Sequence, residues 1–453
     1  MLKSERYADK IKRDDIPVDD SLPGLSVLLV PENVGSILAD LLPESVGVVK
    51  ECRILYIRYK PGTNCIVAYQ LQLEKDGEPK EILFYAKLYT EDDYENATRK
   101  AASSRWIPIP DLEPYITLPE HATILYFYPN DCLIDGLRIL SDLKKIQRIL
   151  YENYDQYPED KWRISNRQIS LSTVRYKPER RVVLRCRARA KNRETSKWVW
   201  LKLYIRVYAD DRGAALFSLQ EKIHKLSEDS GLFTSPRPLT YLPERKALIM
   251  EKARGKQFLE SIEGDNRAAN ISKTAIALAA MHGFDIPGLS EKSRASYIDD
   301  AEETRRMLTK ILPIEAKLAD TIFDELKNHS LAADKPGFVH GDFYYGQVLC
   351  RTRKVSILDF DRSHRGDTVF DIGNFLAHIK LLRLRGELDG EKDIETIFLK
   401  TYKEIKDIEM SNLNFWIAFG LYQLAVGPFR RLEPNWKEGI TTILAECKKI
   451  LES

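Results

Sequence analysis

Residues 337–375 bring together side chains of the types and spacing that phosphoryl transfer requires. The segment reads GFVHGDFYYGQVLCRTRKVSILDFDRSHRGDTVFDIGNF, with Asp342 five residues before Gln347 and 17 residues before Asp359. Transfer of a phosphoryl group to a hydroxyl needs one carboxylate that orients the hydroxyl and accepts its proton. It also needs separate oxygen ligands for Mg²⁺, because one carboxylate alone does not fill both roles. The segment therefore predicts a phosphotransferase site.

The same residues form a pattern that resembles a known family. FVHGDFYYGQVL followed by ILDFDRSHRGDTVFDIGNFLAH is similar to the signature of the aminoglycoside phosphotransferase and choline kinase-like family, relatives of the protein kinases. The resemblance implies that Asp342 is the catalytic base, Asp359 the metal-bridging aspartate and Gln347 the second metal ligand. It further implies ATP as the phosphoryl donor, Mg²⁺ as the cofactor and a small-molecule hydroxyl acceptor.

Gln347 departs from the family's pattern, HGDxxxxN, in which an asparagine is expected. Glutamine offers the same carbonyl oxygen on a side chain that is one methylene longer. Because Mg²⁺ demands tight octahedral geometry, we expect altered metal affinity at this position rather than loss of catalysis.

Three neighbouring side chains are expected to support the site. Asp361 takes the third place of the Asp-Phe-Asp triplet, and the resemblance places Asp371 where the family anchors its catalytic loop. Asp371 also precedes a run of apolar residues at helical spacing, and we favour a helix-capping role for it. His340 is expected to be a packed, hydrogen-bonding residue rather than a proton shuttle.

A strand and the helix after it are expected to hold the nucleotide. Kinase-like folds place a lysine on the third strand of a small β lobe, where it grips phosphates and pairs with a helix glutamate. In this sequence WVWLKLY supplies Lys202, and the helical stretch 210–229 supplies Glu221 as its partner, with Glu228 as the runner-up. Met250 and Glu251 open the segment whose backbone is expected to bind adenine.

No glycine-rich GxGxxG motif precedes this lysine. The turn YKPERR occupies the place where a glycine-rich loop would cover the phosphates. It contains Lys177, Arg180 and Arg181, which either contact phosphates or are solvated on the turn, and we favour solvation. The missing motif leaves ATP and GTP both open as donors.

The β-rich half of the chain contains an internal repeat. Residues 51–89 and 168–204 each read as three strands separated by turns. RYKP at 58–61 recurs at 175–178, KLY at 87–89 recurs at 202–204, and LPE at 118–120 recurs at 242–244. Ordered matches at a nearly constant offset predict a duplicated unit. Lys87 has the strand context of Lys202, but no HGD follows it before the second copy, so we expect no nucleotide role for it.

After residue 255 the periodicity becomes helical, interrupted by the strand-like segments VLCRT and VSILDF. We expect an α+β, protein-kinase-like bilobal fold with an antiparallel, β-rich N-lobe and a mainly helical C-lobe, preceded by an extra N-lobe-like β unit. The expected domains are residues 1–160 for the extra unit, 161–255 for the nucleotide-binding lobe and 256–453 for the helical lobe with the catalytic and metal site.

Composition excludes several partner classes. Lys and Arg number 70 against 68 acidic residues, so the net charge of +2 gives no reason to expect a nucleic-acid or membrane partner. Six scattered cysteines are typical of reduced, structural thiols. The charged N-terminus and the lack of a long apolar run favour a cytoplasmic location. Self-association through the N-terminal repeat stays open.

Two rival functions remain. The duplicated lobe and Gln347 are compatible with a catalytically impaired pseudokinase that binds nucleotide or acts as a scaffold, although Asp342, Asp359 and Lys202 together argue against it. A protein kinase is less favoured, because no activation segment ending in Ala-Pro-Glu is present. Sugars, aminoglycosides, choline-like amines and amino alcohols all remain possible acceptors.

Overall fold

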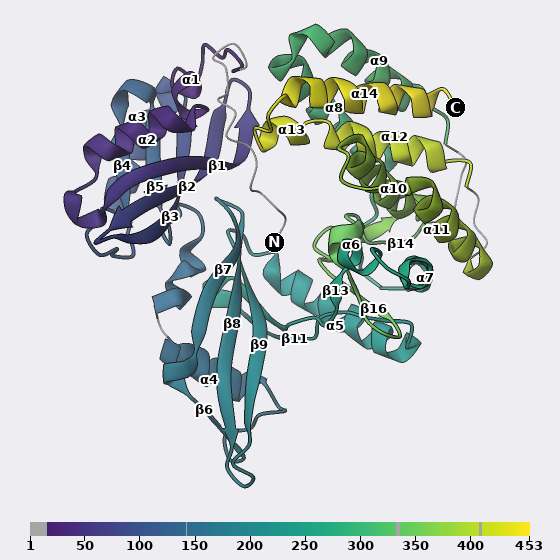
Figure 1. Ribbon diagram of the computed structural model, residues 1–453, viewed down its shortest axis with the longest axis horizontal. Helices are drawn as coiled ribbons and strands as arrows, with labels where there is room; N and C mark the ends of the chain where they lie inside the picture. Colours follow the sequence, from purple (N-terminus) through teal and green to yellow (C-terminus); the bar gives the residue numbers. More distant parts are fainter. Residues whose placement is uncertain (1–15, 142, 332–335, 407–409) are drawn as a thin grey trace.

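The chain divides into two antiparallel sheets and a helical part. The computed structural model describes residues 16–141, 143–331, 336–406 and 410–453. Figure 1 shows the two sheets, drawn in purple to teal, on one side of the molecule and the helices, in green to yellow, on the other. The architecture is α+β, as the sequence predicts.

The first sheet is built from five strands in the order β1-β2-β3-β5-β4. One face joins the main core through residues such as Val67 and Tyr69, and the opposite face forms a smaller buried cluster that includes Ile66 and Tyr126. Its strands are β1 (Val48–Lys60), β2 (Asn64–Lys75), β3 (Glu78–Tyr89), β4 (Tyr115–Leu118) and β5 (Thr123–Phe127). Helices α1 (Leu25–Leu28) and α2 (Pro31–Leu41) precede it, α3 (Glu91–Ser103) follows β3, and α4 (Leu143–Asn153) leads to the second sheet.

The second sheet repeats this topology. Its strands run in the order β7-β8-β9-β12-β11, and β6 (Trp162–Ile164) adds to the far end of β8. They are β7 (Ser170–Lys177), β8 (Arg181–Asn192), β9 (Trp198–Tyr208), β11 (Pro238–Leu242) and β12 (Ala247–Glu251), with α5 (Gly213–Ser230) after β9. The turn before the last strand has a left-handed residue in both copies, Ala122 and Lys246, with φ of 45° and 48°. The predicted duplication is therefore confirmed.

Strand β8 separates the two faces of the second sheet. Val182, Leu184 and Cys186 are buried in a cluster beneath the sheet, whereas Arg181 and Arg185, which alternate with them along the strand, belong to the opposite face. Because successive strand residues point to opposite faces, this alternation lines one side of the sheet with cations. That side is the one that faces the helical part at the start of β8.

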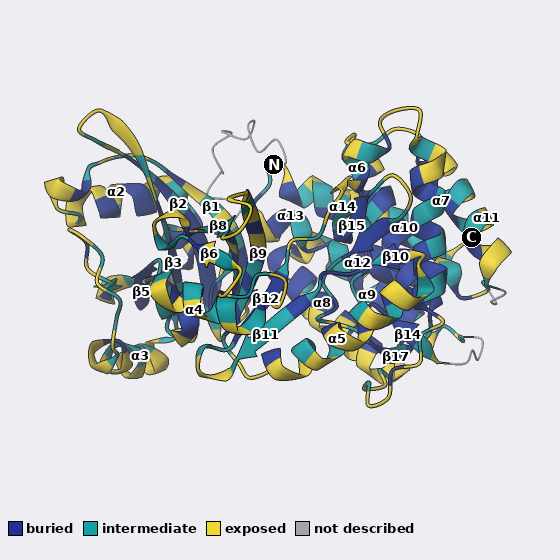
Figure 2. Ribbon diagram, turned by 90° about the horizontal axis from the view of Figure 1, so that it is seen from below, coloured by how far each residue is buried: buried dark blue, intermediate teal, exposed yellow. Residues whose placement is uncertain are grey.

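The helical part packs around α10 (Val369–Leu384), which lies against α12 (Leu413–Leu424) in the buried interior seen in Figure 2. Trp416 and Tyr422 of α12 are buried, in agreement with the core role that their helical spacing favours. The remaining helices are α6 (Phe258–Ser261), α7 (Arg267–Met281), α8 (Arg294–Ile311), α9 (Ala316–Asn328), α11 (Glu391–Ile405), α13 (Gly427–Arg430) and α14 (Trp436–Leu451). Short strands accompany them: β10 (Phe233–Thr234), β13 (Lys256–Gln257), β14 (Gly337–Val339), β15 (Val348–Cys350), β16 (Val355–Ile357) and β17 (His364–Gly366).

Apolar packing joins the first sheet to the helical part. Buried residues of the first sheet and of the helices form one continuous cluster, whereas the core under the second sheet is a separate cluster. Strand β1 contacts α13, and the rings of Tyr59 and Phe429 meet with centroids 6.3 Å apart. The first unit is therefore fixed to the helical part through its core.

Among the described helices, none is long and apolar enough to cross a membrane. All six cysteines are free thiols, as their scattered positions predict.

The first unit meets the second sheet at Gly136, and this contact generates a stability prediction. A Cβ atom at Gly136 would lie 2.0 Å from the carbonyl oxygen of Arg245 and 2.4 Å from Cγ1 of Val207. We expect Gly136→Ala to lower the free energy of unfolding by about 1–3 kcal/mol, because the backbone must shift to relieve the overlap. Gly264→Ala is the control, since a Cβ there meets nothing within 4 Å. Chemical denaturation of both variants checks the expectation, and equal stabilities would contradict it.

Candidate active site

The loop after β14 carries Asp342, and its backbone requires a glycine. Gly341 has φ of 80°, and a Cβ there would lie 2.2 Å from the carbonyl oxygen of Arg362. Only glycine tolerates both the left-handed backbone and this close approach. The Gly of the HGD motif therefore lets the loop pass directly against the chain that follows Asp361.

The Asp371 carboxylate holds this loop through hydrogen bonds to its backbone. It accepts the backbone N–H of His340 at 2.6 Å and that of Gly341 at 2.9 Å. His282 lies 3.0 Å from the same carboxylate through Nε2, and its Nδ1 lies 2.7 Å from the Tyr402 hydroxyl. Burial raises the pKa of Asp371, but hydrogen bonding and charge interaction with His282 outweigh it and hold that pKa below its usual value.

The favoured capping role for Asp371 was wrong. Asp371 is the third residue of α10, and the residue before the helix, Thr368, makes no side-chain cap. The Val369 N–H is instead accepted by the carboxylate of Asp367, at 2.9 Å. Sequence spacing did not separate the two aspartates, because either lies within reach of the first turn.

His340 links the loop that carries Asp342 to the segment that leads to Asp359. Its Nε2 lies 2.8 Å from the Leu358 carbonyl oxygen, and its Nδ1 accepts the Asp342 N–H at 3.3 Å. His340 is fully buried, so the structure places it as the packed, hydrogen-bonding residue that the sequence analysis expects.

Asp342 is partly buried, and its carboxylate makes no hydrogen bond among those described. Burial raises its pKa above the usual value, and the charge of Asp359 raises it further against the opposing effects of Arg362, His340 and Lys177. A carboxylate with a raised pKa is a better proton acceptor than an ordinary exposed aspartate. Lys177 shows the reciprocal effect, since burial and the neighbouring arginines lower its pKa to about 8.

Asp359 and Asp361 lie beside one another and are clamped by two arginines. Arg206 Nη1 lies 3.0 Å from Asp359 and 2.7 Å from Asp361, and Arg181 Nη2 lies 3.1 Å from Asp359. Arg181 also pairs with Asp361, and the Tyr208 hydroxyl is 3.4 Å from that carboxylate. The side chains of the four charged residues are between 11% and 17% exposed, so these are buried ion pairs.

The two carboxylates respond differently to the same cations. Burial raises the pKa of Asp359, but Arg206 and Arg181 overcome it and keep the pKa well below the usual value. Burial and the charge of Asp359 raise the pKa of Asp361 despite the arginines. Asp359 also has a φ of 62°, a conformation that costs energy for a non-glycine residue and is concentrated at functional sites.

Arg206 stands where we expected Lys202. Lys202 is exposed on the same face of β9, four residues earlier, so about 13 Å separates the two positions along the strand. Within the described residues neither Lys202 nor Glu221 has a side-chain partner, and Glu221 and Glu228 lie on the exposed side of α5, whose buried face includes Gln220. The expected ion pair is therefore absent from this part of the chain.

A strand pattern explains why Arg206 was missed. Lys202 and Arg206 share a face because strand side chains repeat every second residue, and no local signal tells which of them is opposite the aspartates. The sequence does show Arg206 on the same strand face as the predicted Lys202, and this is the signal that could have identified it. For Arg181 the favoured solvated role was wrong, because its guanidinium is paired with both carboxylates.

The other predicted site residues occupy defined places. Gln347 is buried. Its backbone N–H donates to the Tyr344 carbonyl, and its backbone carbonyl accepts the Leu358 N–H at 2.9 Å. Met250 is buried under the cationic face with Tyr208. Glu251 ends β12, and the next N–H, that of Lys252, donates to the Lys202 carbonyl.

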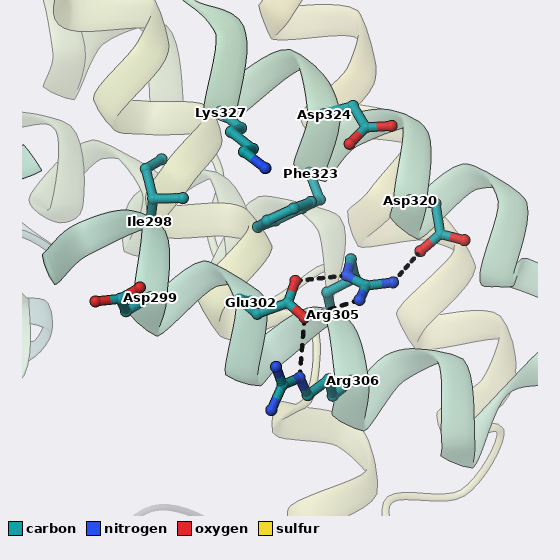
Figure 3. Close-up of a pocket in the computed structure, with 9 residues that line it drawn as sticks. All are labelled: Ile298, Asp299, Glu302, Arg305, Arg306, Asp320, Phe323, Asp324 and Lys327. Atoms are coloured by element: carbon teal, nitrogen blue, oxygen red, sulfur yellow. Dashed lines mark hydrogen bonds and ion pairs between the residues drawn. The ribbon is translucent and has the colours of Figure 1, made fainter. Parts of the chain in front are cut away.

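A hollow of about 580 Å³ lies elsewhere, between α8 and α9 (Figure 3). Four of its charged side chains pair with one another: Glu302 pairs with Arg305 and Arg306, and Arg305 also pairs with Asp320. None of the predicted site residues lines it.

Comparison with known proteins places this site in a family. The model of the phosphotransferase enzyme family matches residues 189–391. The matched segment covers less than half of the chain. It runs from the end of β8 to the start of α11 and includes Arg206, Asp342, Gln347, Asp359 and Asp371. The match agrees with the resemblance that the HGD and Asp-Phe-Asp motifs indicate.

Three of the solved structures that match this chain are an aminoglycoside phosphotransferase, a choline kinase and a choline/ethanolamine kinase family protein. An aminoglycoside phosphotransferase in a ternary complex with AMP-PNP and hygromycin B is 14% identical, covers 68% of this chain and 98% of its own, and has a TM-score of 0.46. A choline kinase from Cryptosporidium parvum is 11% identical, with coverage of 69% and 96% and a TM-score of 0.45. A choline/ethanolamine kinase family protein from Mesorhizobium loti is 13% identical, with coverage of 63% and 88% and a TM-score of 0.41. The search of curated proteins finds no match.

The anchoring by Asp371 generates a prediction about stability. We expect Asp371→Asn to lower the free energy of unfolding by about 2–4 kcal/mol at neutral pH, because it removes a buried charge that accepts two backbone N–H groups. In the wild type the depressed pKa means that this contribution is present above the unfolded carboxyl pKa and is lost as pH falls below it. Denaturation between pH 3 and pH 7 checks both points. A wild-type-like stability of the variant at neutral pH would contradict the assignment.

Proposed function

We propose that the protein transfers the γ-phosphoryl group of ATP, with Mg²⁺, to a hydroxyl group of a small molecule. The observation that carries this proposal is the placement of one free carboxylate, Asp342, beside a clamped pair of carboxylates, Asp359 and Asp361. These are the two separate oxygen functions that phosphoryl transfer needs, and they lie within the matched phosphotransferase segment.

Asp342 acts on the acceptor. Its carboxylate orients the hydroxyl and takes its proton as the hydroxyl oxygen bonds to the γ-phosphorus and the bond to the β–γ bridging oxygen breaks, leaving ADP. Its raised pKa suits this step, because the base then holds the proton more readily while the product leaves. Asp371 and His340 position the loop that carries Asp342 and do not themselves contact the acceptor.

The donor set fits magnesium. Asp359 and Asp361 supply carboxylate oxygens and Gln347 an amide oxygen, and Mg²⁺ is commonly held by one or two carboxylates together with substrate phosphates. Among the described residues no group of three His, Cys, Asp or Glu side chains forms a closed metal cage, which agrees with an ion shared with the nucleotide. When bound, the metal would neutralise charge on the phosphates.

Arg181 and Arg206 are the proposed phosphate ligands from the sheet. A guanidinium binds phosphate and carboxylate in the same bidentate manner. A metal-bound triphosphate would bring a cation to the aspartates and phosphate anions to the arginines. It would therefore take the place of the ion pairs between the aspartates and the arginines. Met250 and Glu251 remain the proposed adenine-binding segment at the end of β12.

A nucleotide-binding module without catalysis is the second candidate. The observation that favours it is the pairing of both carboxylates with arginines, which competes with metal binding. Measurement of catalytic turnover distinguishes the two functions, because only the phosphotransferase forms a phosphorylated product.

Asp342→Asn tests the proposed function. We expect kcat for phosphorylation of a responsive acceptor to fall about 10²–10⁴-fold with little change in nucleotide affinity, because only the proton acceptor is lost. Product formation is measured over a panel of sugars, aminoglycosides, choline-like amines and amino alcohols with ATP or GTP. Asp229→Asn, an exposed change on α5, is the control. Nucleotide binding without product from any acceptor would favour the second candidate.

A pair of matched variants on β9 tests which cation binds phosphate. We expect Arg206→Met to weaken nucleotide binding about tenfold or more, because a bidentate phosphate contact is lost, and Lys202→Met to change it less than twofold. The two substitutions lie on one strand face and remove one charge each. Isothermal titration with a non-hydrolysable ATP analogue and Mg²⁺ measures both. The opposite ranking would return the role to Lys202.

A further inference from the structure

The turn between β7 and β8 is held by the first unit. Glu179, at this turn, has a side chain that is only 5% exposed and reaches two cations of the first sheet. Its carboxylate lies 2.8 Å from Nζ of Lys87 on β3 and 3.1 Å from Nη2 of Arg58 on β1. Arg58 also donates to the Pro178 carbonyl at 3.2 Å. Figure 1 shows the upper end of β7 and β8 reaching the first sheet.

The backbone of the turn is fixed as firmly as its side chain. Asp131, just beyond β5, accepts the Glu179 N–H at 2.8 Å and the Tyr176 hydroxyl at 2.8 Å. The Cys132 thiol donates to the Glu179 carboxylate at 2.8 Å. Glu179 has a φ of 58°, which a non-glycine residue keeps only when its surroundings over-determine it. Four residues of the first unit supply those surroundings.

The repeat makes this contact informative. Lys87 occupies in the first copy the strand position that Lys202 occupies in the second, and Arg58 opens the RYKP sequence that Arg175 opens in the second. In the first copy these cations face a carboxylate of the second copy. A cation pair that is already neutralised by a buried glutamate is not available to a nucleotide phosphate. The first sheet thus carries cations at the positions expected of a kinase-like lobe, but these cations bind a carboxylate of the protein itself.

The held turn also carries cations of the active site. Arg181, two residues after Glu179, is paired with Asp359 and Asp361, and Lys177, two residues before it, lies near Asp342. The first unit shares its core with the helical part that holds these aspartates, whereas the second sheet has its own core. Fixing Glu179 to the first unit therefore fixes Arg181 relative to the aspartates.

We propose that the first unit is a positioning clamp for the active site, in which Lys87 and Arg58 seat Glu179 so that Arg181 and the β7–β8 turn close over the nucleotide phosphates. Glu179 is a positioning residue that contacts neither substrate. Its kinetic consequence rests on the proposed phosphotransferase function, and its structural consequence does not.

Lys87→Met and Glu179→Gln test the clamp. We expect each to raise the Kd for the ATP analogue with Mg²⁺ about tenfold and to speed hydrogen exchange at the amides of residues 179–181, because the turn is no longer seated. The double variant should weaken binding no more than the stronger single variant, since both remove the same contact. Lys87→Arg, which keeps the charge, should restore most of the affinity. Lys75→Met, which removes an exposed cation of the same unit that pairs with Asp111, is the matched control.

Two outcomes would overturn the clamp. Unchanged exchange at residues 179–181 in folded Lys87→Met would show that the first unit does not hold the turn. Faster exchange with unaltered nucleotide affinity would show that the turn does not serve the phosphates. If wild type binds nucleotide but phosphorylates no acceptor, the proposed activity fails while the exchange and affinity changes still decide the clamp. If Glu179→Gln does not fold, Lys87→Met and Lys87→Arg carry the test.

Discussion

Four charges meet between the second sheet and the helical part, and the proposed chemistry depends on them. Arg181 and Arg206 come from neighbouring strands, and Asp359 and Asp361 follow β16. All four side chains are largely buried, so removal of any one would leave an uncompensated charge in a medium of low dielectric constant. The ligand that we propose, a metal-bound polyphosphate, would satisfy both signs at once, whereas a simple anion or a metal ion alone would satisfy only one pair.

Two further carboxylates hold the chain segments that bring these charges together. Asp371 accepts two backbone N–H groups and fixes the loop of Asp342 to α10. Glu179 fixes the β7–β8 turn to the first unit. Both are buried and oriented by several hydrogen bonds, which is the condition under which a buried charge specifies one geometry. The loop that carries Asp342 and the β7–β8 turn are thus each held in place by a buried carboxylate, that of Asp371 for the loop and that of Glu179 for the turn.

The duplicated unit shows how one strand pattern serves two purposes. In both copies a cation occurs on the third strand at the same point of the repeat. In the second copy the cation that meets the aspartates is Arg206, four residues further along the strand, and in the first copy Lys87 meets Glu179. The partner differs because one face of the first sheet packs on the helices, and Lys87 lies on the opposite face, where Glu179 of the second unit reaches it.

The sequence by itself determined the repeat, the strands and helices, the family resemblance and the residues Asp342, Gln347 and Asp359 as the candidates for chemistry, because periodicity and motif spacing are local properties. It did not determine that Arg206 rather than Lys202 meets the aspartates, that Arg181 is paired rather than solvated, or that Asp371 anchors a loop rather than caps a helix. Nor did it connect Lys87 with Glu179, 92 residues away. Side chains on one strand face are equivalent in sequence, and only the packing of the sheets against the helices decides which of them faces an opposite charge.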